Sequence, residues 1–318
     1  MPATAEIREL RGARANVVLD VPQAVWDEAE TASAGVTVAT RVMILTGGEC
    51  RFTCSMCDLW RHTLPGPTPA GVLPQQIRHG LARPADHEPP RWVKLYNGSN
   101  FFDARNVPTE DLPAIAKLVT GFDRVVVENH PRLCGDAVPR FRDRLAGRLE
   151  VAMGLETAHP AALPALNKQM TLDDMADACE RLAGWGVDAR VFVLLGVPGI
   201  AADEAVEWCL RSVDFARACG VRHVSIVPLR QGNGWIDRLL TEGRASLPTA
   251  TDLEAVAETC LQQLDHTSAT VVTVDLWDFA KLAGSCALCR PPRQARLEEM
   301  NRSQRPFPAG SLACGCQA

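Results

Sequence analysis

Short apolar runs alternate with amphipathic stretches along most of the chain. Runs rich in branched aliphatic residues predict six buried strands, at 36–45, 92–96, 124–128, 149–155, 189–195 and 222–228. Between them, apolar residues recur at helical spacing and predict helices at 73–81, 109–119, 137–146, 172–184 and 203–219. Strands that alternate with helices form a parallel sheet, because parallel neighbours need a crossover connection.

Six strands with intervening helices predict an α/β fold, a partial (β/α)6 TIM-like barrel. Residues 6–33 carry a charged, helix-like pattern, in which Pro22 is placed to begin a helix through Trp26 and Ala29. Residues 256–264 predict a further helix and 270–274 a further strand. We therefore expect an N-terminal helical cap at 1–35, the barrel at 36–275, and a C-terminal cysteine-rich, metal-binding extension at 276–318.

Composition narrows the classes of protein to consider. The 318 residues are 47% hydrophobic, which is enough for a large core. The net charge of -5 argues against a freestanding nucleic-acid binder, although a local basic patch or a basic partner is compatible with it. The first residues lack the pattern of a signal peptide, and no apolar run approaches the length of a membrane span. The expectation is a cytoplasmic protein, in which clustered cysteines bind metal rather than form disulfides.

Three of the twelve cysteines lie in the loop that follows the first barrel strand. Cys50, Cys54 and Cys57 have the spacing C-x3-C-x2-C. Thiolate is the soft ligand that iron-sulfur clusters need, so this loop can hold three corners of a 4Fe-4S cluster. The fourth iron would then be open to a cofactor or substrate. A zinc knuckle or unrelated buried thiols are the alternatives.

Two close cysteine pairs stand near the C-terminus. Cys286 and Cys289 form one pair, and Cys314 and Cys316 form the other. Paired spacing of this kind predicts a closed four-thiolate metal site, with zinc as the first choice and a second 4Fe-4S cluster as the rival. Cys179, Cys209, Cys219 and Cys260 lie in helical, apolar patterns and are expected to be small core residues. Cys134 follows His130 in the loop after the third strand and is also expected to be structural, with a thiol near the site as the alternative.

Polar and flexible residues follow the ends of the predicted strands, which is where parallel sheets of this kind carry their chemistry. Asn97, Gly98 and Ser99 follow the second strand, and Glu128 and Glu156 end the third and fourth. The fifth strand leads into an apolar turn that contains Gly196 and Pro198, and the sixth leads into a glycine-rich loop with Arg230 and Asn233.

The cysteine loop resembles the cluster-binding loop of the radical S-adenosylmethionine (SAM) superfamily, although Met56 stands where that superfamily usually has an aromatic residue. The resemblance implies a 4Fe-4S cluster that cleaves SAM reductively, and a 5'-deoxyadenosyl radical that takes a hydrogen atom from substrate. It assigns the SAM amino group to the Asn97–Ser99 turn, which lacks the usual Gly-Gly-Glu, and further cofactor contacts to Glu128, Glu156, Gly196 and Pro198. Hypothetically, Arg230, His130, Lys168 and Asn233 hold the substrate.

Several further segments resemble one branch of this superfamily, whose members act on tRNA bases; they include residues 94–97, 128–131, 154–157, 166–171 and 301–304. The resemblance implies a one-electron reductant such as flavodoxin or ferredoxin. If tRNA is the substrate, the net negative charge of the chain implies that a partner protein carries the tRNA. A small metabolite or a peptide is the alternative substrate, and a non-catalytic iron-sulfur or zinc protein is the alternative from another class.

Overall fold

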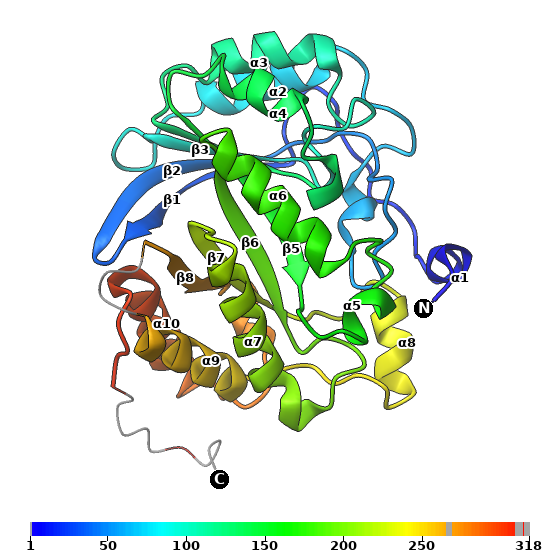
Figure 1. Cartoon of the computed structure of the whole chain (residues 1–318), viewed down its shortest axis with the longest axis vertical. Coiled ribbons are helices and arrows are strands. Elements are labelled where there is room, and N and C mark those ends of the chain that lie inside the picture. Colours follow the sequence, from blue (N-terminus) through cyan, green and yellow to red (C-terminus); the bar gives the residue numbers. More distant parts are fainter. Residues whose placement is uncertain (1, 265–268, 309–313, 315–318) are drawn as a thin grey trace.

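The computed structural model describes residues 2–264, 269–308 and 314. All eight strands form one sheet in the order of the sequence (Figure 1). The strands are β1 (Ala24–Ser33), β2 (Val36–Ile44), β3 (Trp92–Tyr96), β4 (Arg124–Glu128), β5 (Arg148–Glu156), β6 (Asp188–Leu195), β7 (His223–Pro228) and β8 (Val271–Val274). From β2 to β8 every neighbouring pair is parallel, whereas β1 is antiparallel to β2.

Helices follow the strands and cover the outer face of the curved sheet (Figure 1). They are α1 (Thr4–Glu9), α2 (Val72–Ala82), α3 (Leu112–Leu118), α4 (Ala137–Arg142), α5 (Ala162–Ala165), α6 (Leu172–Gly184), α7 (Ala205–Ala218), α8 (Trp235–Thr241), α9 (Ala250–Gln263) and α10 (Arg290–Ser303). Most of these helices share one core with the outward residues of the strands, in which Val125, Leu149, Val191, Ile115 and Met175 are fully buried. Helices α5 and α8 contribute to a second, smaller cluster. The predicted barrel is confirmed as a nearly closed one. In the described residues, no helix is both long enough and apolar enough to cross a membrane.

The N-terminal helical cap is a wrong prediction for residues 24–33. They form β1, and α1 is the one helix in the described part of residues 1–35. The acidic residues that make β1 look like an exposed helix are paired inside the fold: Asp27 with Arg41 at 2.7 Å, and Glu28 with Lys94 at 2.6 Å. Because these contacts come from other strands, Arg41 of β2 and Lys94 of β3, the pattern of residues 24–33 alone could not reveal them. The boundary at residue 35 therefore falls inside a β1–β2 hairpin, whose turn uses Gly35 at φ +70.

Buried charges fill the barrel near the amino ends of its strands. The Glu150 carboxylate is fully buried and accepts from Arg190 and Arg222 at 2.7 Å each and from Arg124 at 2.8 Å. Burial opposes its ionisation, but the Arg190 and Arg222 guanidiniums prevail and hold the pKa of Glu150 well below its usual range. This network closes one end of the barrel, which leaves the carboxyl ends of the strands for a site.

Helix α10 covers the seam between the two edge strands, β1 and β8. The Asn301 side chain accepts from Val274 N and donates to Val274 O, at 2.9 Å each, and Gln304 makes the same pair of bonds to Val272 at 2.8 Å. The Thr31 hydroxyl of β1 donates to the Asn301 carbonyl at 3.0 Å. Two side-chain amides thus satisfy the open edge of β8 in place of another strand.

Candidate functional site

The cysteine loop lies at the carboxyl end of β2, directly after Gly47 and Gly48. Cys50, Cys54 and Cys57 are half-buried and line a cavity of about 310 Å³ together with Gly98 and Ser99. In the described residues these three sulfurs do not form a group within 4.8 Å of one another.

Two asparagine side chains pin the backbone of this loop. Asn167 Nδ2 donates to Thr53 O at 2.8 Å, and Asn233 Nδ2 donates to Ser55 O at 2.7 Å. Ser55 N in turn donates to Leu166 O at 2.8 Å. Segments that lie more than 100 residues away in the sequence therefore hold the backbone between the cysteines. Asn233, predicted to contact substrate, has its amide donor committed to the loop.

The thiols of this loop fit a metal cluster better than they fit free thiolates. Burial raises the pKa of Cys54 to about 11, and burial also raises the pKa of Cys50 and of Cys57. The protein alone therefore keeps these groups protonated at neutral pH. A metal that binds at this loop has to displace these protons.

The strand-end carboxylates reach the same cavity as the cysteines. Glu128 Oε1 accepts from the backbone N–H groups of Asn97 and Gly98 at 2.6 Å each, and burial raises the pKa of Glu128 to about 7. Glu156 also lines the cavity and pairs with Lys168 at 2.9 Å. The predicted convergence of these two acids is therefore present in the structure.

His130 is fixed in a neutral form beside the loop. Its Nδ1 accepts from Arg132 N at 3.2 Å, so the proton is on Nε2, which donates to Lys168 O at 3.0 Å. The ring stacks on Phe52 of the cysteine loop, with ring centroids 3.8 Å apart. Burial lowers the pKa of His130 to about 3. Both ring nitrogens are engaged, so His130 supports the site rather than exchanging protons at neutral pH.

The other predicted residues separate into two groups. Arg230 lines the cavity, but its guanidinium is paired with Asp275 and with Asp278. Gly196 and Pro198 do not line it; a Cβ on Gly196 would lie 2.8 Å from Pro248 Cδ, so this glycine allows close packing. The apolar wall comes instead from residues within the strands, Phe192 and Leu194, which face the cavity.

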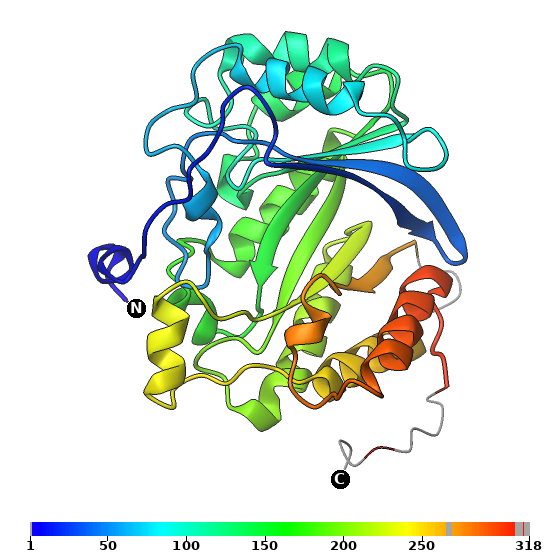
Figure 2. The ribbon, with the colours of Figure 1, turned by 180° about the vertical axis from the view of Figure 1, so that it is seen from behind.

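A second and larger cavity, of about 1310 Å³, opens from the cysteine cavity. The two cavities share the lining residues Leu59, Gly98, Glu128, Phe192, Val227 and Arg230. Trp26 and Trp277 form part of its wall, with ring centroids 5.5 Å apart. The extended segment between α1 and β1 supplies another part of the wall, and Figure 2 shows it crossing the near side of the molecule. We call this cavity the chamber.

Sequence reasoning missed most of the chamber. Tyr96, the single tyrosine of the chain, and Phe192 line it, and their rings meet edge to face at 6.5 Å. Their place inside strand-like runs was a usable signal. Trp26 had no such signal, because its position depends on β1 being a strand.

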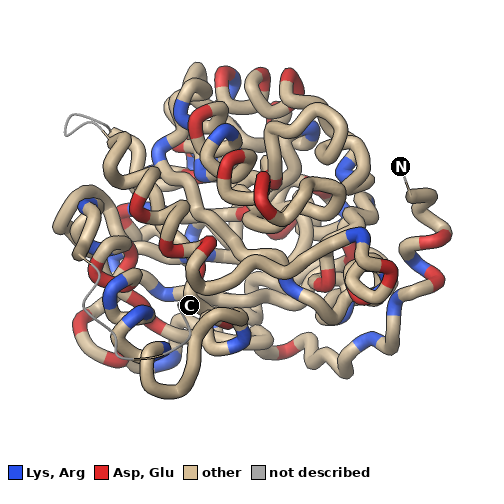
Figure 3. The backbone as a smooth tube through the Cα atoms, turned by 90° about the horizontal axis from the view of Figure 1, so that it is seen from below, with Lys and Arg blue, Asp and Glu red and all other residues tan. Residues whose placement is uncertain are grey.

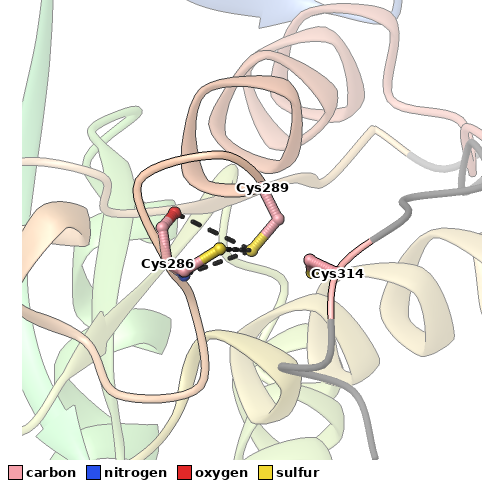
Figure 4. Close-up of side chains that lie close together, drawn as sticks. All are labelled: Cys286, Cys289 and Cys314. Atoms are coloured by element: carbon pink, nitrogen blue, oxygen red, sulfur yellow. Dashed lines mark hydrogen bonds between the residues drawn. The ribbon is translucent and has the colours of Figure 1, made fainter.

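The tail cysteines come together as predicted, as far as the structure describes them. The sulfurs of Cys286, Cys289 and Cys314 lie within 4.8 Å of one another and form a group that can hold a metal (Figure 4). Cys286 and Cys289 lie just before α10, with their sulfurs 3.7 Å apart. Cys316, the predicted fourth ligand, lies outside the described residues.

Known proteins support the resemblance drawn from the motifs. The chain is 27% identical over 205 residues to the archaeosine synthase subunit beta of Methanosarcina acetivorans. The predicted resemblance to the radical SAM superfamily is confirmed. That alignment covers 61% of this chain, which spans only 59% of the length of the archaeosine synthase subunit. No family model matches the chain.

Solved structures show similar but distant folds. The archaeal Elp3 of Methanocaldococcus infernus has a TM-score of 0.48 at 13% identity, covering 64% of this chain and 51% of that one. Coproporphyrinogen III oxidase from Escherichia coli, a radical SAM enzyme, has a TM-score of 0.47 at 10% identity, covering 82% and 55%.

Proposed function

We propose that this chain is a radical SAM enzyme whose cluster is held by Cys50, Cys54 and Cys57. When bound, such a cluster supplies the electron that cleaves SAM, and the 5'-deoxyadenosyl radical released takes a hydrogen atom from substrate. The observation that carries the proposal is the shared cavity: three thiols of one loop face the carboxylates of Glu128 and Glu156 at the carboxyl end of a parallel barrel.

The residues of the chain supply binding, orientation and exclusion of water. Glu156 is placed to accept hydrogen bonds from ribose hydroxyls or an ammonium group. Glu128 orders the turn at Asn97 and Gly98 through two backbone hydrogen bonds, which fixes the backbone at the wall of the cysteine cavity. Phe192 and Leu194 offer an apolar surface for a planar ring. Asn97 supports this turn from a buried position, and Ser99 lines the cavity.

The chamber supports a substrate group with a planar ring. Its volume of about 1310 Å³ exceeds the roughly 300–1,000 Å³ usual for small-molecule pockets, so it can admit part of a larger molecule. Trp277 is 71% exposed beside Trp26 at the chamber wall, and each base that stacks on an aromatic ring gains about 1–3 kcal/mol. We propose a nucleoside within tRNA, and the relative named archaeosine synthase subunit beta points to the same class.

Delivery of tRNA would fall to a partner protein. The chain has a net charge of -5, and acidic and basic residues are interspersed along its backbone (Figure 3). Such a surface gives weak attraction to phosphates. A one-electron reductant such as flavodoxin or ferredoxin is the other partner that the reaction needs.

For the tail cysteines we propose zinc. Tetrahedral zinc with bonds of about 2.3 Å places its sulfurs about 3.8 Å apart, and the sulfurs of Cys286 and Cys289 are 3.7 Å apart. A 4Fe-4S cluster would place them on different irons and further apart. Cys316 is the proposed fourth ligand.

The enzyme proposal is tested by the products of SAM. Protein reconstituted anaerobically with iron and sulfide, then given dithionite and SAM, should form 5'-deoxyadenosine and methionine. Cys54→Ala should abolish both products, whereas Cys219→Ala, at a half-buried cysteine after α7, should retain them. Bound cluster without 5'-deoxyadenosine in the wild type would favour the non-catalytic alternative.

The substrate proposal needs a separate test. With the partner and unmodified tRNA present, Trp277→Ala should lower modification of the tRNA about tenfold while leaving SAM cleavage unchanged, since about 1.4 kcal/mol of lost stacking corresponds to that factor. If the wild type and Trp277→Ala instead turned over a small metabolite or a peptide at equal rates, that result would contradict the nucleoside proposal.

A further inference from the structure

Lys168 is a buried lysine beside the cysteine loop. Its side chain is 9% exposed and its ammonium pairs with the Glu156 carboxylate at 2.9 Å. Both side chains line the cavity that Cys50 and Cys54 also line. Burial disfavours the charged form of a lysine, and the Glu156 carboxylate opposes that effect. A buried ion pair at the wall of a cavity is a candidate for a functional role there.

The surrounding backbone is shaped to hold this pair. Asn167 and Gln169, on either side of Lys168, have φ values of +51 and +58, and Glu156 has φ +66. These are three of the four non-glycine residues with positive φ in the described chain. Gly154 leaves the necessary space, since a Cβ there would lie 2.6 Å from Lys168 Nζ. Strained backbone that gathers at one cavity is typical of functional sites.

Lys168 is also connected to the cysteine loop through its neighbours in the chain. Its carbonyl accepts from His130 Nε2, whose ring stacks on Phe52 of the loop. Asn167 and Leu166 bond the loop backbone directly. The ammonium therefore has a fixed position relative to the cysteine loop, and it lines the same cavity as Cys50 and Cys54.

From this geometry we infer that Lys168 is a positioning residue that sets the reduction potential of the cluster bound by the loop, with Glu156 as its counter-charge. Reduction adds negative charge to a cluster, so a nearby fixed cation favours the reduced state and raises the potential, and a nearby anion lowers it. The two side chains thus act with opposite sign. The inference rests on the proposed function, because it needs the cluster.

Lys168 and Glu156 should shift the midpoint potential in opposite directions, which a merely structural role of the pair would not produce. Midpoint potentials are measured by redox titration followed by electron paramagnetic resonance (EPR), at one fixed pH, on reconstituted proteins matched for iron and sulfide content. Lys168→Met should shift the midpoint to a more negative value, and Glu156→Gln should shift it to a more positive value. The double variant should return close to the wild type, and Lys168→Arg should preserve the wild-type value. Lys117→Met, on the exposed face of α3, is the charge control and should have no effect.

The possible outcomes separate this inference from the function it rests on. If the wild type binds no 4Fe-4S cluster, the proposed function fails. If all variants bind the cluster but Lys168→Met and Glu156→Gln shift the midpoint in the same direction, or neither shifts it, the inference about Lys168 is wrong while the proposed function stands. Lys168→Met could fail to fold because Glu156 loses its partner. In that case the direction in which Glu156→Gln shifts the midpoint potential, and the return of the double variant toward the wild-type value, still test the inference.

Discussion

Asn233 offers the sharpest distinction between holding substrate and holding the cysteine loop. Its Nδ2 donates to Ser55 O and its Oδ1 accepts from Ile236 N, each at 2.7 Å and both buried. Asn233→Ala would leave one buried acceptor and one buried donor unpaired, at a cost of about 1–3 kcal/mol for each. We expect the free energy of unfolding to fall by roughly 2–6 kcal/mol.

Asn233→Asp is the matched variant. It keeps an acceptor for Ile236 N at the start of α8 but replaces the donor to Ser55 O with a carboxylate oxygen. Its loss of stability at neutral pH should be at least as large, because a buried carboxylate oxygen then faces the Ser55 carbonyl oxygen with no donor between them. Both variants should bind less iron after reconstitution, because the backbone between Cys54 and Cys57 is no longer held. Urea unfolding and iron analysis measure the two effects. Unchanged stability and iron content, with impaired product formation alone, would refute loop pinning and restore the substrate role.

Three further predictions concern other parts of the site. A Glu128 pKa of about 7 rather than 4.5 means that folding disfavours the charged carboxylate, by on the order of 3 kcal/mol. Between pH 5 and pH 8 the free energy of unfolding of the wild type should therefore fall by more than that of Glu128→Gln, as measured by urea unfolding. An equal change in the two proteins would contradict this. Arg230→Ala should lower product formation about tenfold and leave SAM cleavage intact, and a joint fall in both would show that Arg230 does not contact substrate. Cys289→Ser should lower bound zinc below one per chain and reduce the melting temperature, because α10 begins beside this residue and covers the edge of β8; unchanged zinc by metal analysis would exclude Cys289 as a ligand.

Most of the barrel could be predicted from local pattern. The strands β3 and β4 and helix α6 have the predicted bounds, because each is a short apolar or amphipathic segment with clear ends. β1 could not be predicted, since its acidic residues are satisfied by Lys94 and Arg41 from other strands. The role of α10 was equally hidden, because nothing local indicates that Asn301 and Gln304 replace a strand partner.

The candidate site was predictable in its residues more than in their roles. Position at strand ends brought Glu128, Glu156 and the cysteines together, as a parallel sheet requires. Roles depend on partners, which the sequence does not show. The Asn233 amide donates to the cysteine loop, the His130 ring donates to Lys168 O, and Lys168 has a carboxylate neighbour at 2.9 Å. Side-chain contacts between separate segments of the chain leave no periodic signal.

The central claim is that three thiolates hold a 4Fe-4S cluster and leave one iron open to SAM. EPR of the reduced, reconstituted protein tests it directly. The account predicts about four irons per loop, a reduced-cluster signal, and a changed signal when SAM is added, all lost in Cys54→Ala. A cluster whose signal is unaffected by SAM, or protein that binds no cluster at this loop, would contradict it.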